Sequence, residues 1–180
     1  MVKTVLITGS SKGLGAQLAR VFVEAGWNIL LHGRNAQDLQ KIQQELSPRV
    51  IDVMQGDIRE TKTLDVLEAG AQKHTINLLI NNAGIGLKQP LENISEEQIR
   101  EMLETNLLAP LQLIQRIYAF FVKKKEGTII NINSMSGMEN HYQRTIYCAS
   151  KWGLRGFSDT LKREAQEKGV RLLDIYPSMI

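Results

Sequence analysis

Residues 3–15 read Lys3-Thr4-Val5-Leu6-Ile7-Thr8-Gly9-Ser10-Ser11-Lys12-Gly13-Leu14-Gly15, and this stretch decides the fold. Its first half is short, apolar and β-branched, which predicts a buried parallel strand over residues 3–8. Three glycines follow, and a helical pattern then covers residues 16–25. Glycines in such a turn let the backbone approach a pyrophosphate, and the helix N-terminus offers unpaired N–H groups. The stretch therefore predicts a dinucleotide-binding turn, with a plain strand-to-helix turn as the alternative.

Strand and helix patterns alternate along the whole chain. The remaining strands are expected at residues 28–32, 49–54, 77–80, 127–133 and 170–176, and the remaining helices at residues 36–46, 61–73, 96–125 and 146–168. Ser95 and Gln98 form a capping box at the start of the third of these helices, and Pro110 is expected to bend it near Asn106. Such alternation predicts an α/β fold, a doubly wound parallel sheet of the Rossmann-like three-layer type, in one domain over residues 1–180.

The composition favours a soluble globular protein. The 180 residues are 43% apolar and 23% charged, and the net charge of +3 is too small and too scattered to indicate nucleic-acid binding. The single cysteine, Cys148, excludes an intrachain disulfide and suits a reducing compartment. No metal-ligand spacing, signal peptide or membrane-spanning run is visible in the sequence. We therefore expect a cytoplasmic protein without a metal site.

The end of the second predicted strand bears on the choice of cofactor. NAD sites usually place an acid there for the ribose 2′-hydroxyl, whereas this chain has His32-Gly33-Arg34. Arg34 and Lys12 could together hold a 2′-phosphate, and two solvated surface cations are the alternative. We predict a preference for NADP(H) over NAD(H).

Several polar features fall at the carboxyl ends of predicted strands. Asp57 follows the third strand and could accept a hydrogen bond from an adenine amino group. Asn81-Asn82-Ala83-Gly84 follows the fourth strand, and its backbone could pack against a ribose. Each is by itself only a turn signal. Ligands of doubly wound sheets bind at this one edge, so the shared placement indicates a site.

Tyr147 and Lys151 are candidates for proton transfer. Side chains four residues apart are neighbours on a helix, and a nearby ammonium favours a phenolate. The pair is therefore a candidate acid/base unit, although such a spacing also arises by chance. Ser134, which ends the fifth strand, and Asn106, in the bent helix, are expected near the same edge.

Together these motifs resemble the short-chain dehydrogenase/reductase family in its single-domain form. The matching segments are Thr8 to Gly15, Asn81-Asn82-Ala83-Gly84, Asn106, Asn131-Ile132-Asn133-Ser134 and the Tyr147-xxx-Lys151 pair. The resemblance implies a sheet in the order 3-2-1-4-5-6, followed by a seventh strand. It also implies a homodimer or homotetramer, whose interface uses the long helix around Asn106 and the helix bearing Tyr147.

The resemblance implies a role for each site residue. Tyr147 would be the general acid for carbonyl reduction or the base for alcohol oxidation, and Lys151 would favour its phenolate and bind the nicotinamide ribose. Ser134 would bind the substrate oxygen, and Asn106 would hold a water in a proton relay. The cofactor-binding residues would be Gly9, Ser11, Lys12, Gly13, Leu14, Gly15, Arg34, Asp57, Ile58, Asn82, Ala83, Gly84, Tyr147, Lys151 and Pro177.

The end of the sequence departs from the family pattern. The family usually shows Pro-Gly after the sixth strand, whereas Pro177 is followed here by Ser178, and the sequence stops at Ile180. We expect the natural protein to be longer, with the seventh strand and the substrate-covering segment beyond Ile180. Without them, residues 171–176 would form an apolar edge of the sheet.

Two classes of function stay open, and the first is favoured. One is an NADP(H)-dependent oxidoreductase that interconverts a ketone or aldehyde and an alcohol, and the other is a cofactor-binding sensor or scaffold without turnover. Apolar residues at Ile85, Leu87, Met135, Met138 and Tyr142 suggest an apolar side to the substrate site, where His141 could also lie. His32, His74 and Cys148 are interpreted as structural residues.

Overall fold

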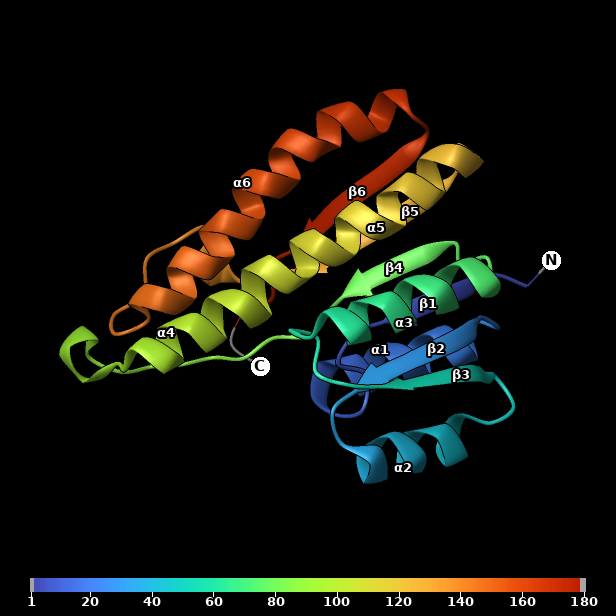
Figure 1. The fold of residues 1–180 in the computed structure, drawn as a ribbon, viewed down its shortest axis with the longest axis horizontal. Helices are drawn as coiled ribbons and strands as arrows, with labels where there is room; N and C mark the ends of the chain where they lie inside the picture. Colours follow the sequence, from blue (N-terminus) through green and yellow to red (C-terminus); the bar gives the residue numbers. More distant parts are fainter. Residues whose placement is uncertain (1, 179–180) are drawn as a thin grey trace.

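Six parallel strands form the centre of the molecule, in the order β3-β2-β1-β4-β5-β6 (Figure 1). The computed structural model describes residues 2–178. The strands are β1 (Thr4–Ile7), β2 (Asn28–Gly33), β3 (Val50–Gln55), β4 (Leu78–Asn81), β5 (Gly127–Ile132) and β6 (Val170–Ile175). The predicted sheet and its strand order are confirmed, and each strand end lies within two residues of its predicted place.

Helices connect the strands and cover both faces of the sheet. They are α1 (Gly13–Glu24), α2 (Ala36–Leu46), α3 (Thr61–Lys73), α4 (Glu96–Leu103), α5 (Ala109–Lys124) and α6 (Thr145–Glu167), with short 3₁₀ turns η1 (Leu91–Asn93) and η3 (Met135–Gly137). The predicted start of α1 at residue 16 was wrong by three residues. The backbone of Lys12 is extended and caps the helix, so the last glycines of the loop already belong to its first turn.

The single helix expected over residues 96–125 is divided by a π-helical segment. This segment, η2 (Glu104–Leu108), lies between α4 and α5 and contains Asn106. Pro110 stands in the first turn of α5, directly after the π-helical segment, and has no N–H to donate. The irregularity predicted at Asn106 is therefore present, in the form of a widened turn. The capping box of Ser95 and Gln98 is also present in both directions.

Two apolar clusters hold the three layers together. One lies between the sheet and α3, α5 and α6, and Phe121, Leu79 and Leu113 are among its fully buried members. The other lies between the sheet and α1 and α2, around Val5 and Leu31. Burying a large apolar side chain contributes about 1.5–3 kcal/mol, so these clusters supply the main stabilisation.

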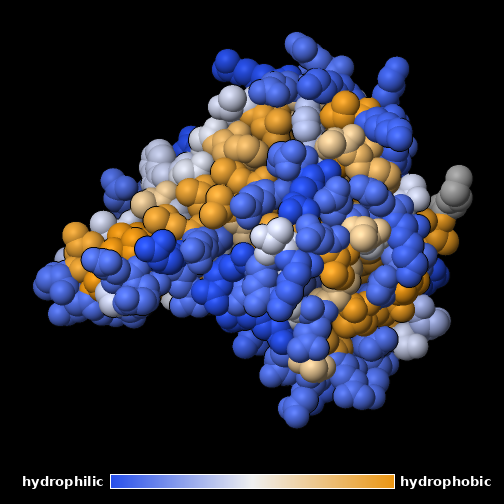
Figure 2. All heavy atoms as spheres, in the orientation of Figure 1, coloured by the Kyte–Doolittle hydropathy of each residue, from blue (hydrophilic) through white to orange (hydrophobic). Residues whose placement is uncertain are grey.

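Two apolar surfaces stay open in the described residues. An apolar groove on α4, η2 and α5 is lined by Ile99, Leu103, Leu107, Leu108 and Leu111, and Figure 2 shows apolar side chains gathered along these helices. β6 is the sheet edge, with Leu173 and Ile175 about half exposed. The apolar edge expected at residues 171–176 is thus confirmed, while the expected seventh strand lies outside the described residues. No helix within residues 2–178 is long and apolar enough to cross a membrane.

A buried histidine fastens the glycine loop to β2. His32 is 2% exposed, and its Nδ1 accepts a hydrogen bond from the backbone N–H of Gly9 at 3.3 Å. Ser10 bonds to the backbone N–H and C=O of His32. Since Nδ1 accepts, the proton of the neutral imidazole is on Nε2, which has no hydrogen-bond partner among the described residues. Burial lowers the pKa of His32 to about 4, so the imidazole is neutral at pH 7.

We expect this histidine to destabilise the protein in acid. An unfolded histidine takes up a proton near pH 6.5, whereas folded His32 does so near pH 4, so the unfolded state gains stability as the pH falls between these values. His32→Asn keeps an acceptor for Gly9 and removes the titration. Between pH 7 and pH 4.5, urea unfolding should show wild type losing about 2 kcal/mol more than His32→Asn. Equal losses in the two proteins would contradict this prediction.

Candidate active site

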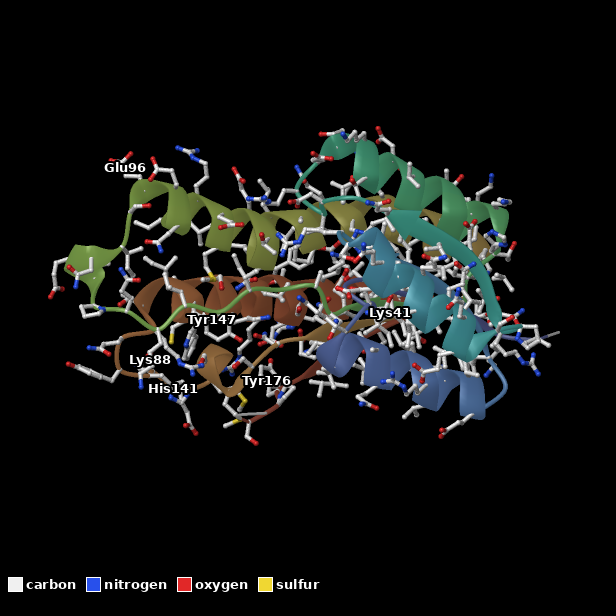
Figure 3. The ribbon with its side chains drawn as sticks, turned by 90° about the horizontal axis from the view of Figure 1, so that it is seen from below. Lys41, Lys88, Glu96, His141, Tyr147 and Tyr176 are labelled. Carbon is white, nitrogen blue, oxygen red and sulfur yellow. The ribbon has the colours of Figure 1, made fainter. Side chains whose placement is uncertain are left out.

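A cleft of about 1240 Å³ runs along the carboxyl ends of the strands. It extends from the glycine loop and the end of β2 to the start of α6. Figure 3 shows Lys88, His141 and Tyr147 at this edge, with Lys41 away from them on α2. A volume of this size accommodates a dinucleotide together with a small substrate.

Two glycines allow the loop between β1 and α1 to pack tightly. Gly9 has a positive φ of 64°, and a Cβ on it would lie 2.9 Å from the Cα of Ala83. A Cβ on Gly15 would collide with the carbonyl oxygen of Gly9. The side chain of Asn82 donates to the carbonyls of Thr8 and Gly9, both at 3.0 Å. Asn82 therefore fixes the shape of the glycine loop. In this shape the backbone of the loop is exposed to the cleft.

One end of the cleft carries several charges. Lys12 and Arg34 line it, as predicted, and so do Asp38 and Asp57. The carboxylate of Asp57 accepts hydrogen bonds from Arg59, at 3.0 Å from Nε and 2.7 Å from Nη2. These hydrogen bonds hold the pKa of Asp57 below its usual range. Asp57 is thus a fixed, ionised acceptor, whereas Lys12 and Arg34 present their charges to the cleft.

Tyr147 and Lys151 lie together at the other end of the cleft. Lys151 is 5% exposed, and its Nζ donates to the carbonyl of Ile132 at 3.0 Å and lies 5.8 Å from the ring centre of Tyr147. Burial lowers the pKa of Lys151 to about 8, against the opposing effect of the negative charge of Asp174. The guanidinium of Arg144 lies 5.9 Å from the ring of Tyr147. Two cationic side chains therefore lie close to the Tyr147 ring.

Ser134 faces the same part of the cleft from the end of β5. Its Oγ accepts a hydrogen bond from the backbone N–H of Ser136 at 3.1 Å. Because that contact uses an acceptor position, the hydroxyl proton can be donated to a ligand oxygen. Pro177 lines the cleft nearby, and its carbonyl accepts from the N–H of Met135.

Asn106 is not among the residues that line the cleft, and its hydrogen bonds in the described residues do not include Lys151. Its Oδ1 accepts from the backbone N–H of Ile85 and its Nδ2 donates to the carbonyl of Ile85, both at 2.8 Å. The same Nδ2 lies 3.4 Å from Oγ of Ser150 on α6. Asn106 is 1% exposed. Its side chain therefore connects the segment after β4 to the helix that bears Tyr147.

The structure brings most of the predicted site residues into one cleft. Those that line it are Gly9, Ser11, Lys12, Leu14, Gly15, Arg34, Asp57, Ile58, Asn82, Ala83, Gly84, Ser134, Tyr147, Lys151 and Pro177. Gly13 and Asn106 are not among the lining residues. Gly13 has a positive φ of 56° and shapes the turn. Gly13 and Asn106 therefore affect the cleft through the backbone that surrounds it, and do not line it themselves.

Other lining residues were not assigned to the site from the sequence. They are Lys88, Glu139 and Arg144. Of the residues suggested for the substrate site, Ile85, Met135, Tyr142 and His141 line the cleft, whereas Leu87 and Met138 do not. The substrate end is therefore more polar than expected. His32, interpreted as structural, both fastens the loop and lines the cleft.

Comparisons with known proteins agree with this geometry. The family model of the short chain dehydrogenases matches residues 3–180. The chain is 32% identical to the 3-oxoacyl-(acyl-carrier-protein) reductase FabG of Chlamydia trachomatis, over 99% of this chain and 74% of the relative. It is also 32% identical to the NADP-dependent 3-hydroxy acid dehydrogenase YdfG of Salmonella typhi, over 98% of this chain and 72% of the relative.

A solved structure supports the same assignment. The bulky-bulky ketone specific alcohol dehydrogenase of Comamonas testosteroni superposes with a TM-score of 0.92 at 30% identity, over 98% of this chain and 73% of that protein. The chain thus spans about three quarters of the length of these relatives. With its six-stranded sheet, its glycine loop and a family match over almost its whole length, the chain belongs to the short-chain dehydrogenase family of oxidoreductases.

Proposed function

We propose that this protein is an NADP(H)-dependent oxidoreductase that interconverts a ketone or aldehyde and an alcohol, with Tyr147 as the general acid/base. The observation that carries the proposal is the convergence of Ser134, Tyr147 and Lys151 in the cleft that the glycine loop opens into. A hydroxyl donor, a phenol and a buried cation are the groups that proton transfer to a substrate oxygen needs.

The residues of the cleft fit a dinucleotide. A Cβ on Gly9 would fill the space against Ala83, so the loop backbone can lie close to a pyrophosphate. Asp57 offers a fixed acceptor, and Arg34 and Lys12 offer charge for a 2′-phosphate. Further binding residues in the proposal are Ser11, Leu14, Ile58, Gly84 and Pro177. When bound, the nicotinamide supplies or accepts the hydride.

The residues beside the substrate have separate roles in this proposal. Ser134 donates its hydroxyl proton in a hydrogen bond to the substrate oxygen and positions it. In reduction Tyr147 donates its proton to that oxygen, and in oxidation its phenolate takes the proton of the alcohol. Lys151 supports the phenolate with its charge, and Asn106 holds a water in a proton relay from Lys151 to solvent.

The preference for NADP(H) rests on charge. Arg34 and Lys12 lie at the end of the cleft near β2, and the pKa of Asp57 is lowered further by the charge of Arg34. The relative from Salmonella typhi is named as NADP-dependent. Arg34 can bind a 2′-phosphate through two hydrogen bonds, which the 2′-hydroxyl of NAD(H) cannot match.

We extend the proposal to the domain organisation, the oligomeric state and the location of the protein. It acts as one domain on a small-molecule substrate, and the apolar groove on α4, η2 and α5 serves as the interface of a homodimer or homotetramer. A cytoplasmic location stays a prediction from the lone cysteine. No observation favours the alternative of a sensor without turnover, because each group needed for proton transfer lies in the cleft.

Tyr147→Phe tests the acid/base role. NADPH oxidation by the full chain is measured against a panel of ketones and aldehydes. We expect kcat to fall about 10²–10⁴-fold, because the variant has no proton to donate, while cofactor binding is retained. Tyr118→Phe is the matched control, since the hydroxyl of Tyr118 has no hydrogen-bond partner in the described residues. Cofactor binding without turnover on any substrate in wild type would favour the sensor instead.

Arg34→Ala tests the cofactor preference. Charge-assisted hydrogen bonds contribute about 1.5–3 kcal/mol, so kcat/KM for NADPH should fall about 10–100-fold, with little change for NADH. Lys41→Ala, which removes an exposed cation of α2 outside the cleft, should change neither value. Equal kcat/KM values for the two cofactors in wild type would refute the preference.

A further inference from the structure

A carboxylate that the proposed mechanism does not use lies buried behind the active site. The side chain of Asp174, on β6, is 0% exposed. Its Oδ1 accepts from Oγ of Ser158 on α6 at 2.8 Å, and its Oδ2 lies 2.8 Å from Nζ of Lys162. Burying a carboxylate is energetically unfavourable unless the carboxylate is paired, so the buried position of Asp174 requires a structural or functional reason.

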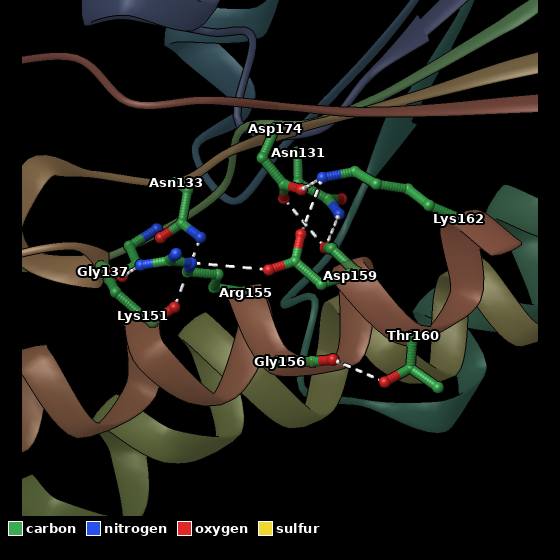
Figure 4. A network of polar contacts seen from close by, with 11 residues as sticks. Asn131, Asn133, Gly137, Lys151, Arg155, Gly156, Asp159, Thr160, Lys162 and Asp174 are labelled. Carbon is green, nitrogen blue, oxygen red and sulfur yellow. Dashed lines mark hydrogen bonds and ion pairs between the residues drawn. The ribbon is translucent and has the colours of Figure 1, made fainter.

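Asp174 ends a chain of polar side chains that crosses the sheet. Asn81 donates to Asn131 at 2.9 Å, Asn131 donates to Ser158 at 2.9 Å, and Ser158 donates to Asp174. Figure 4 shows Asn131 and Asp174 reaching towards α6, the helix that also bears Lys151. Every hydrogen in the chain is donated towards Asp174, so the carboxylate is the final acceptor.

The same elements hold Lys151. Asn131 and Asp174 are partners in the ladder between β5 and β6, and Nζ of Lys151 donates to Ile132, the next residue of β5. Asn133 donates to the carbonyl of Lys151 at 3.3 Å. Ser158 lies two turns after Lys151 on the buried side of α6. Asp174 thus anchors the helix of Lys151 and places a negative charge on the same face of the sheet.

Lys162 neutralises Asp174 only in part. Lys162 is also bound by Asp159, with Nζ 3.0 Å from Oδ1. The side chains of Lys162 and Asp159 are 35% and 52% exposed, so water screens their charges, whereas Asp174 is buried. Asp174 is thus the buried member of this ion-pair cluster, and its negative charge opposes the loss of a proton from Lys151.

We propose that Asp174 is a positioning residue for the reaction: its buried charge keeps Lys151 in the ammonium form at neutral pH. Lys151 is 5% exposed, and burial alone favours the neutral amine. A neutral Lys151 would no longer support a phenolate on Tyr147. The consequence for catalysis rests on the proposed function, while the effect on the charge of Lys151 does not.

Other charged and titratable groups lie on the elements packed against α6 or line the same cleft. They are Tyr147, Arg144 and Arg155 on or next to α6, Glu101 on α4, Glu104 on η2, Asp174 on β6, and Glu139 and His141 in the loop before α6. Among them Asp174 raises the pKa of Lys151, against the larger effect of burial.

The experiment follows the charge of Lys151 directly, in the full-length protein without cofactor. Lysine Cε resonances of ¹³C-labelled protein are followed with pH, and the signal of Lys151 is identified by its absence in Lys151→Met. In wild type the signal should titrate near pH 8, apart from the exposed lysines near ~10.4. In Asp174→Asn the midpoint should move to lower pH by about one unit or more.

Two further variants separate charge from structure. Ser158→Ala removes the hydrogen bond that anchors the helix but keeps the charge of Asp174, so the midpoint should not fall. Lys162→Met removes the cation that is paired with Asp174, so the titration midpoint of Lys151 should rise. This variant tests the proposal if Asp174→Asn does not fold. An unmoved midpoint in folded Asp174→Asn, a fall in Lys162→Met, or equal falls in Asp174→Asn and Ser158→Ala would overturn the proposal.

In the active full chain, the alkaline limb of the pH–rate profile should move with the midpoint. If the midpoint shifts while Tyr147→Phe stays active, the proposed acid/base role fails and the effect of Asp174 on Lys151 stands. If Tyr147→Phe is inactive and the midpoint does not move, the acid/base role stands and the inference about Asp174 fails.

Discussion

The close approach of Gly9 to the backbone of Ala83 is the constraint on which the cleft depends. The ends of β1 and β4 are neighbours in the sheet, and a side chain at Gly9 would push them apart. Asn82 then closes the loop from one side, and His32 closes it from the other. Because three strands fix one loop, the backbone that faces the cofactor is set before any ligand binds.

At the other end of the cleft the constraint is electrostatic. Lys151 is buried where an amine would readily lose its proton, yet the acid/base role proposed for Tyr147 needs a cation beside it. The carbonyl of Ile132 binds the ammonium, and Asp174 supplies a counter-charge from the next strand. The polar chain from Asn81 to Asp174 thus ties the centre of the sheet to the chemistry at its edge.

Much of this arrangement could be predicted from the sequence, because local signals agreed with the global fold. The bounds of α2 and α3 and the capping box at Ser95 follow from residue patterns alone. The family motifs placed Ser134, Tyr147 and Lys151 at one edge. The π-helical form of η2 was not predictable, because widening a turn around Asn106 depends on contacts with Ile85 and Ser150, which lie far away in the chain.

At the substrate end of the cleft, too, the sequence alone could not predict every residue. An apolar side was expected from five residues, of which Ile85, Met135 and Tyr142 line the cleft and Leu87 and Met138 do not, while Lys88, Glu139 and Arg144 line it as well. A strand fixes the direction of each side chain by alternation, whereas a loop fixes it only through its own turns. The loops at the substrate end were therefore predicted only in part. The position of the Arg144 guanidinium beside Tyr147 follows from such a turn, so the lining of this end of the cleft depends on loop conformation as well as on the sheet.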